Sequence, residues 1–274
     1  MSYKIITLDL DGTLTNSKKE ITPPTRQALI DIQKLGYKVI LASGRPTNGI
    51  MPLALELDLD KYGSYILSFN GGRIINCKTM EVMYEKTLPQ NIIPDLYEHA
   101  IKYNVGIITY DNEAIIAGTE INEYMAYESK IVSMPIKQVD NFSEYVDFPV
   151  VKCLISGEPE ILVKVEEELK EKYHQYLNIF RSEPFFLEIM PRGIDKAHSL
   201  LKLLSSIGMT EDEMICCGDG FNDISMIEVA GLGVAMENAQ DKVKEAADYI
   251  TLSNDEDGIL HVINKFILKN KAHN

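Results

Sequence analysis

The sequence is poor in cysteine, with four residues among 274: Cys77, Cys153, Cys216 and Cys217. None of them shows the spacing of a metal-ligand motif, and the adjacent pair lies in an apolar run. A chain of this length can bury a large hydrophobic core and does not depend on disulfides for stability. We therefore interpret the cysteines as reduced core residues.

Long hydrophobic runs are also missing. No apolar stretch reaches the roughly 18–20 residues that span a bilayer. The first residues pass directly into a strand-like run, without the pattern of a signal peptide. With 45% hydrophobic and 25% charged residues, the composition is typical of a soluble globular protein. These features predict a cytoplasmic protein with no membrane partner.

Positive charge is scarce, because 27 Lys and Arg residues face 41 Asp and Glu residues, a net charge of −14. Proteins that bind DNA or RNA need a cationic surface, so this balance argues against a nucleic-acid partner. Residues 85–188 contain 9 basic and 19 acidic residues and carry −10 of that charge. The uneven distribution indicates a boundary between two regions, and the oligomeric state stays open.

Strand and helix patterns alternate near both ends of the chain. Apolar strand-like runs at 4–9, 37–42, 65–69 and 214–217 are each followed by a turn and a helical pattern, and 73–76 with 82–86 resembles a hairpin. Further strands are expected at 233–236 and 249–251, and helices at 196–206, 225–229, 242–247 and the C-terminal end. This rhythm predicts an α/β fold with a doubly wound, Rossmann-like parallel sheet.

The middle of the chain also alternates, with helices expected at 93–103 and 159–173 and strands at 105–110, 114–118 and 150–156. Leu88-Pro89 and Pro184 bracket it. The sequence thus predicts a core domain made of 1–86 plus 190–274, with a second, inserted α/β domain at 87–189.

Four short stretches lie where a doubly wound sheet places its active site, at the carboxyl ends of strands. Asp9 and Asp11 follow the first strand as D-x-D-G-T, a specific pattern in which Gly12 allows a sharp turn beside two carboxylates. Ser43-Gly44-Arg45-Pro46 is expected to open a helix, where a hydroxyl and free amides can bind an anion; a plain helix cap is the alternative.

The other two stretches lie in the last third of the chain. Lys196 opens a helix, where its charge opposes the helix dipole, so helix propensity does not explain it. Gly218-Asp219-Gly220-Phe221-Asn222-Asp223 follows a buried strand, and its carboxylates suit a hard cation with oxygen ligands.

In this order, the four stretches resemble the signature motifs of the haloacid dehalogenase superfamily of phosphatases. The insertion between the second and third motifs resembles the Cof-type branch with its large α/β cap. The resemblance implies that Asp9 is the nucleophile and Asp11 the acid–base residue. It also implies that Mg²⁺ is held by Asp9, the Asp11 carbonyl and Asp219, with Asp223 in an outer position, and that Ser43, Gly44, Lys196 and Asn222 contact phosphate or substrate.

The implied activity is a Mg²⁺-dependent phosphatase that hydrolyses phosphate monoesters of small metabolites, such as sugar phosphates, through an aspartyl-phosphate on Asp9. The alternatives are a phosphomutase acting on sugar phosphates and a catalytically weak regulatory or binding protein of the same fold. A response-regulator-like phospho-acceptor fits poorly, because its acceptor lies on a later strand.

The cap is expected to set specificity, and Glu188, Asn70 and Arg45 are the candidates for binding substrate hydroxyls. Because the inserted region carries most of the negative charge, the sequence predicts a preference for neutral, hydroxyl-rich monophosphates over bisphosphates. The alternative is that these acids face solvent, where salt screens them within about 10 Å.

Overall fold

The computed structural model describes residues 3–269, and its contacts divide the chain into two compact units. The core unit comprises 1–84 and 195–274, and the inserted unit comprises 85–194. These limits lie two and five residues from the predicted boundaries at 87 and 189.

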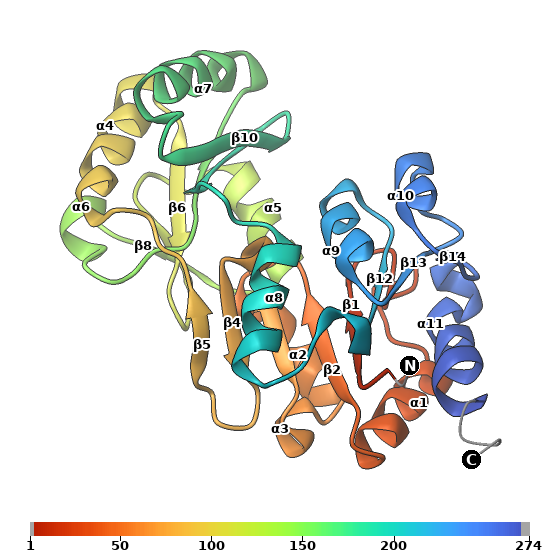
Figure 1. The fold of residues 1–274 in the computed structure, drawn as a ribbon. Coiled ribbons are helices and arrows are strands. Elements are labelled where there is room, and N and C mark those ends of the chain that lie inside the picture. The colour runs from red at the N-terminus through yellow and green to blue at the C-terminus, as the bar shows by residue number, and fades with distance from the viewer. Residues whose placement is uncertain (1–2, 270–274) are drawn as a thin grey trace. The chain divides into compact units, whose positions relative to one another are not determined.

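The core unit is built on one sheet with the strand order β14-β13-β12-β1-β2-β3-β4-β5 (Figure 1). Neighbouring strands from β14 to β3 are parallel, and β4 runs antiparallel to β3. The strands are β1 (Ile5–Leu8), β2 (Lys38–Ala42), β3 (Tyr65–Ser68), β4 (Arg73–Asn76), β5 (Val82–Glu85), β12 (Met214–Gly218), β13 (Leu232–Ala235) and β14 (Tyr249–Ile250).

Helices cover both faces of this sheet, because most side chains of its central strands are apolar and successive ones point to opposite faces. On one face Ile6, Leu8 and Cys217 join a large buried cluster, and on the other Ile5 and Cys216 join a second. The helices are α1 (Pro23–Lys34), α2 (Thr47–Glu56), α3 (Leu59–Tyr62), α8 (Lys196–Ser206), α9 (Ile224–Val229), α10 (Asp241–Ala246) and α11 (Gly258–Val262), which continues as a π-helix over Ile263–Leu268.

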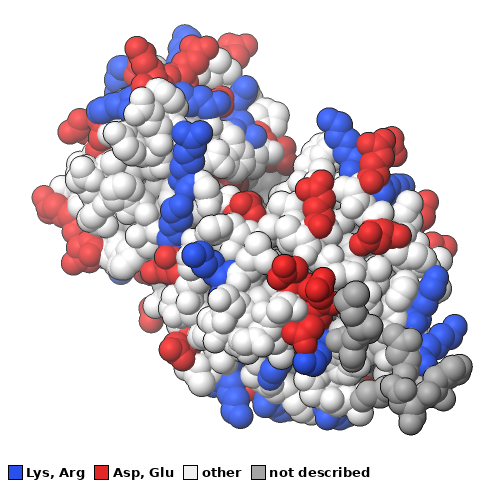
Figure 2. All heavy atoms as spheres, viewed as in Figure 1, with Lys and Arg blue, Asp and Glu red and all other residues white. Residues whose placement is uncertain are grey.

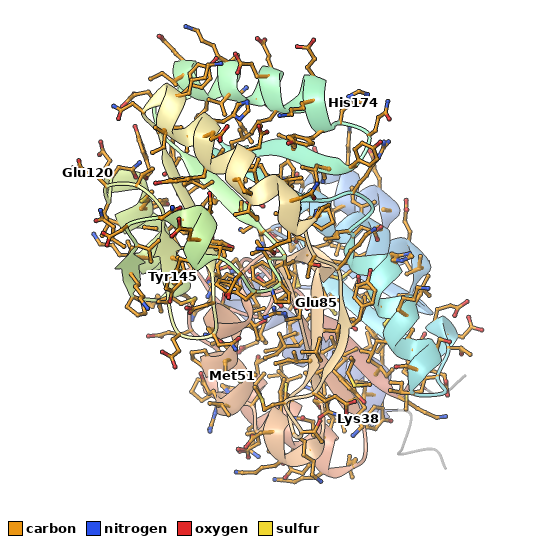
Figure 3. The ribbon with its side chains drawn as sticks, turned by 90° about the vertical axis from the view of Figure 1, so that its left-hand side faces the viewer. Lys38, Met51, Glu85, Glu120, Tyr145 and His174 are labelled. Atoms are coloured by element: carbon orange, nitrogen blue, oxygen red, sulfur yellow. The ribbon has the colours of Figure 1, made fainter. Side chains whose placement is uncertain are left out.

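The inserted unit has its own six-stranded sheet, ordered β10-β11-β9-β6-β7-β8, and its own buried core. All neighbouring pairs are antiparallel except β7 and β8. Its elements are β6 (Gly106–Tyr110), β7 (Ile115–Ala117), β8 (Ile136–Gln138), β9 (Cys153–Ser156), β10 (Leu177–Glu183) and β11 (Phe186–Pro191), with α4 (Ile93–Tyr103), α5 (Glu123–Val132), α6 (Phe142–Tyr145) and α7 (Pro159–Tyr173). At its surface the side chains of Glu120 and His174 are exposed (Figure 3).

One predicted start was wrong: α2 begins at Thr47, with Pro46 as its N-cap, and not at Ser43. The backbone explains the difference, because Ser43 N donates to Leu67 O and Phe69 N donates to Arg45 O. Residues 43–45 are thereby held against the end of β3 as a loop. The four cysteines are buried and free, as expected. Within residues 3–269, every helix is too short or too polar to cross a membrane.

Candidate active site

Three neighbouring strands bring the predicted motifs together. The sheet places β1 between β12 and β2, with Leu8 in register with both Cys217 and Leu41. Each of the three strands ends just before a motif residue: Asp9 follows β1, Ser43 follows β2 and Asp219 follows β12. Residues far apart in the chain therefore meet at one edge of the sheet, as the parallel topology requires.

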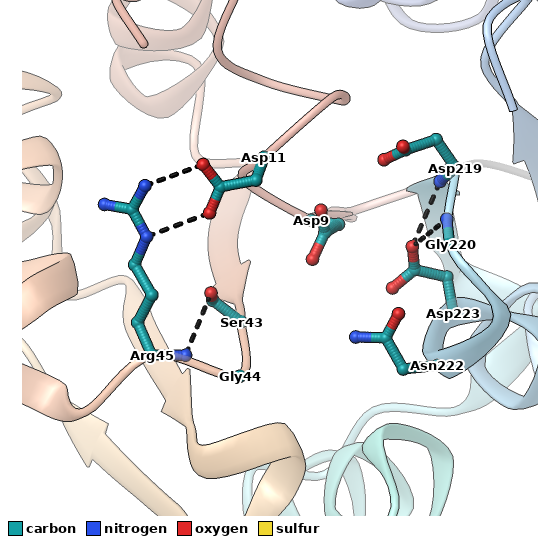
Figure 4. Close-up of a pocket in the computed structure, with 9 residues that line it drawn as sticks. All are labelled: Asp9, Asp11, Ser43, Gly44, Arg45, Asp219, Gly220, Asn222 and Asp223. Carbon is teal, nitrogen blue, oxygen red and sulfur yellow. Dashed lines mark hydrogen bonds and ion pairs between the residues drawn. The ribbon is translucent and has the colours of Figure 1, made fainter. Parts of the chain in front are cut away.

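A pocket of about 290 Å³ opens at this edge (Figure 4). It is lined entirely by core-unit residues, and all but Gly220 were candidates from the sequence. They are Asp9, Asp11, Ser43, Gly44, Arg45, Asp219, Gly220, Asn222 and Asp223.

The loop after β1 is shaped to place its carboxylates beside Asp219. Gly12 has a φ of +91°, and a Cβ at this position would lie 2.4 Å from Asp219 Oδ2. Only glycine fits both the conformation and the space. The next residue, Thr13, donates its hydroxyl to Asp219 Oδ1 at 2.7 Å. The D-x-D-G-T pattern therefore joins the first motif directly to the fourth.

Lys196 is fully buried behind the pocket. Its Nζ donates to Asp9 Oδ1 and to Asp223 Oδ1, both at 2.6 Å, and to the Ala42 carbonyl at 2.9 Å. Burial opposes its charge, but the carboxylates of Asp9 and Asp223 raise the pKa of Lys196 above its ordinary value. All three ammonium donors are thus engaged by the protein, and the cation orients the carboxylate of Asp9.

Asp9 is itself only 7% exposed. Burial raises its pKa to about 7, against the opposing effect of Lys196 and with further increases from Asp223 and Asp219. Burial likewise raises the pKa of Asp219. The two carboxylates are therefore costly to keep ionised without added positive charge in the pocket.

The carboxylate oxygens of Asp9, Asp219 and Asp223 lie within 4.8 Å of one another. This donor set contains only oxygen, which suits Mg²⁺ or another hard cation and not a soft metal. Asp223 is less available than the other two: its Oδ2 accepts the backbone N–H groups of Asp219 and Gly220, and its Oδ1 accepts Lys196. It shapes the loop that presents Asp219.

Asp11 points toward Arg45 (Figure 4). Arg45 Nε donates to Asp11 Oδ2 at 2.9 Å and Nη2 donates to Oδ1 at 2.7 Å, while Lys19 Nζ also donates to Oδ1, at 2.8 Å. Burial would raise the pKa of Asp11, but the hydrogen bonds from Arg45 and Lys19 outweigh it and lower that pKa. Arg45, predicted as a substrate contact, is thus occupied by Asp11. The sequence analysis missed Lys19, because it belongs to none of the four motifs.

Asn70 joins the second motif to the fourth. Its backbone N–H donates to the Ser43 carbonyl at 2.9 Å, and its Oδ1 accepts Asn222 Nδ2 at 3.0 Å. A Cβ on Gly44 would lie 3.2 Å from Asn70 Nδ2, so a larger residue there would crowd this amide. Glu188, the remaining candidate, belongs to the inserted unit, where its Oε1 lies 3.5 Å from Nζ of the buried Lys152.

Residues 6–263 match the family model of the haloacid dehalogenase-like hydrolases. The chain belongs to this family. The resemblance seen in the sequence and the α/β fold class are therefore confirmed.

Named relatives of this haloacid dehalogenase-like hydrolase include enzymes. The 5-amino-6-(5-phospho-D-ribitylamino)uracil phosphatase YcsE of Bacillus subtilis is 31% identical over 98% of this chain and 97% of its own length. A crystal structure of a haloacid dehalogenase-like hydrolase from Bacteroides thetaiotaomicron is 52% identical, with a TM-score of 0.93 over 96% of this chain and 99% of that one. The subclass IIB sugar phosphatase BT4131 is 28% identical, with a TM-score of 0.78 over 96% and 98% of the two chains.

Proposed function

We propose that this protein is a Mg²⁺-dependent phosphatase that hydrolyses phosphate monoesters of small metabolites through an aspartyl-phosphate on Asp9. The observation that carries the proposal is the buried Lys196, which holds Asp9 beside the carboxylates of Asp219 and Asp223 at the base of an open pocket. The phosphatase class is that of the enzymes YcsE and BT4131. The proposal adds to this class a requirement for Mg²⁺ and a sugar phosphate as the substrate.

In the first step, an oxygen of the Asp9 carboxylate attacks phosphorus and the ester P–O bond breaks. The proton on Asp11 passes to the departing oxygen, so the leaving group departs as an alcohol. In the second step, a water oxygen attacks phosphorus while its proton passes to Asp11. The bond between phosphorus and Asp9 breaks and releases inorganic phosphate. Splitting the reaction in this way replaces one difficult hydrolysis by two easier displacements.

The metal would be held by the carboxylates of Asp9 and Asp219 and by the backbone carbonyl of Asp11, with Asp223 in an outer position. When bound, Mg²⁺ supplies the positive charge that lets an anionic phosphate approach these carboxylates. Ser43 Oγ, the Gly44 amide and Asn222 are proposed to bind the phosphate oxygens. Lys196 was predicted as a further phosphate contact, but its three donors are engaged by Asp9, Asp223 and the Ala42 carbonyl, so its proposed role is to hold Asp9.

The inserted unit is proposed to act as the cap that selects the substrate, with Glu188 as its candidate side chain and Asn70 as that of the core. Arg45, the third candidate, is held by Asp11 and the Gly49 carbonyl. Sugar and polyol monophosphates are the proposed class. A release assay on several dozen phosphorylated metabolites would identify the preferred one.

The activity is tested with p-nitrophenyl phosphate. We expect steady turnover with Mg²⁺, loss of turnover with excess EDTA and recovery when Mg²⁺ is restored. Asp219→Ala should raise the Mg²⁺ concentration needed for half-maximal rate or abolish the activity. Full activity after exhaustive chelation would contradict the metal requirement.

A further inference from the structure

The sheet of the inserted unit has two unlike faces. On one face, Ile155 of β9 and Leu187 of β11 join the buried apolar cluster that α4 and α7 help to form. Successive residues of a strand point to opposite faces, so Leu154 and Glu188, which are in register, lie on the other face. Within the described strands β6, β9 and β11, Glu188 is the one charged residue. Its presence on a sheet of apolar strands calls for a partner.

The partner is Lys152, which immediately precedes β9 and is only 5% exposed. Its Nζ lies 3.5 Å from Glu188 Oε1 and 5.3 Å from the centre of the Tyr110 ring. At this length the contact with Glu188 is an ion pair and not a hydrogen bond. Within residues 3–269, neither the ammonium nor the Glu188 carboxylate takes part in a hydrogen bond. Two charged groups therefore lie together with their donors and acceptors unused.

A second polar pair on the same face is complete by contrast. The Tyr110 hydroxyl donates to Oε1 of the buried Glu128, on α5, at 2.6 Å. Buried charged groups normally complete their hydrogen bonds with protein, water or a ligand, because unfilled positions cost free energy. The side chain of Glu188 keeps 14% of its surface exposed. The pair of Lys152 and Glu188 is thus both incomplete and within reach of a bound molecule.

We propose that Lys152 and Glu188 form a hydroxyl-binding pair that recognises the sugar or polyol part of the substrate, with Lys152 as the donor and Glu188 as the acceptor. The inference rests on the proposed function, in which the inserted unit selects the substrate. A hydroxyl group both donates and accepts, so one hydroxyl can bridge the pair, or two neighbouring hydroxyls can share it. A second phosphate would be attracted by Lys152 but repelled by Glu188, whereas a neutral hydroxyl suits both.

The alternative is a structural ion pair whose unused positions are filled by water. The test compares p-nitrophenyl phosphate, whose leaving group has no further hydroxyl, with the hexose or polyol monophosphate that shows the highest kcat/KM in the release assay. We expect Lys152→Met to lower kcat/KM for the hydroxyl-rich ester about 10-fold more than for p-nitrophenyl phosphate, mainly through KM, because a hydrogen bond to a charged group is lost. Glu188→Gln, which keeps an acceptor, should lower it less.

Deoxy analogues of the same substrate test the contact from the other side. At one hydroxyl position, the wild-type enzyme should prefer the parent ester over its deoxy analogue by about 10-fold, because the analogue leaves a buried polar group unpaired. Lys152→Met should not distinguish these two esters, since the group that reads the hydroxyl is gone. This double comparison isolates the contact between Lys152 and the hydroxyl.

Lys170→Met is the matched control, because it breaks an exposed pair of the same residue types in the same unit, Lys170 with Glu166 at 2.7 Å. It should leave the ratio of the two kcat/KM values within about 2-fold of wild type. Because Lys152→Met leaves Glu188 without its cation, the double variant Lys152→Met/Glu188→Leu is made alongside. Its apolar side chains should keep the unfolding temperature close to that of wild type while the preference for the hydroxyl-rich ester is lost.

A ratio of kcat/KM values within about 2-fold of wild type in the folded double variant would overturn the role of the pair, since losses would then be equal on both substrates. A wild-type enzyme that turns over p-nitrophenyl phosphate but no hexose or polyol monophosphate would overturn it as well. Absence of Mg²⁺-dependent turnover of p-nitrophenyl phosphate by the wild-type enzyme would instead count against the proposed function.

Discussion

In the core unit the ammonium of Lys196 is fully buried between two carboxylates, whereas in the inserted unit Lys172 lies more than half exposed beside Asp95. The exposed pair links α7 to α4 on the outside of the unit. The buried trio lies at the ends of the central strands, where burial weakens screening by water. The same residue types thus serve two purposes: surface pairing in one unit and preorganisation of a site in the other.

The excess of acidic side chains in the inserted unit also lies mostly at its surface. Most of its acidic side chains are exposed, including Glu98, Glu113, Asp140 and Glu167. Figure 2 shows acidic side chains scattered over the visible surface and not gathered into one patch. Exposed charges are screened by salt within about 10 Å. The net charge of these exposed side chains therefore has little effect on a ligand more than about 10 Å away, and the preference for monophosphates stays a prediction.

The largest contrast should come from replacing one aspartate in each unit. Asp9→Asn should abolish turnover and covalent labelling by phosphate, because it removes the nucleophile. Asp140→Asn, the same change at an exposed position of the inserted unit, should leave the rate within about 2-fold of wild type. Residual activity of Asp9→Asn above about 1%, which is only about 2.7 kcal/mol of barrier, would rule out the covalent mechanism.

Replacing one lysine in each unit should separate the two kinds of ion pair by stability. Lys196→Met leaves Asp9 and Asp223 buried without their cation, and we expect a loss of about 3–5 kcal/mol in the free energy of unfolding. Lys172→Met should cost about 1 kcal/mol or less. Urea unfolding of the two variants at neutral pH measures both values, and similar losses would show that burial does not distinguish the pairs.

The pH dependence of stability should also distinguish the buried site. The pKa of Asp9 is raised from 3.8 to about 7 in the folded protein. Its contribution to stability is therefore fully present below pH 4 and lost as the pH rises toward 7. In metal-free buffer, Asp9→Asn should gain stability relative to wild type over this range, by on the order of 4 kcal/mol.

Urea unfolding at pH 4, 5.5 and 7 in EDTA would measure this gain. A difference between Asp9→Asn and wild type that does not change with pH would show that Asp9 is ionised throughout. Adding Mg²⁺ at pH 7 should reduce the difference, because a bound cation favours the ionised carboxylate.

The smallest expected effect concerns the substrate. If the acids of the inserted unit act on the ligand, kcat/KM for a hexose monophosphate should exceed that for the matching bisphosphate at low salt, and the ratio should shrink at high salt. A ratio that salt does not change would assign the preference to fixed contacts. A bisphosphate preference at both ionic strengths would exclude the predicted selectivity.

Much of the fold was predictable because its signals are local. The helices at 93–103, 159–173 and 196–206 were predicted to the residue. No element was predicted for α5, β8 or β10. β10 is buried only at alternate positions near its start and then exposed, so its apolar pattern is too short to detect.

For the site as well, local patterns were predictable and contacts between distant residues were not. The four motifs contain every residue that lines the pocket, and Gly220 is the one lining residue to which no role was assigned. The hydrogen-bond partners of these residues were not predictable from the sequence. The bonds from Lys196 to Asp223 and from Arg45 to Asp11 depend on the register of neighbouring strands. The position of Lys19 beside Asp11 depends on a turn that is held by the hydrogen bond between Ser17 and Asp255. Spacing along the chain carries no information about such contacts.

The position of the insertion has a consequence for how such chains can diversify. Lys86 Nζ donates to the Arg192 carbonyl at 2.5 Å, so the inserted unit leaves and returns to the core through neighbouring residues. None of the residues that line the pocket belongs to it. If the inserted unit acts as the proposed cap, another domain between β5 and α8 would leave the complete set of pocket residues in place, so the recognised substrate could change while the chemistry is retained.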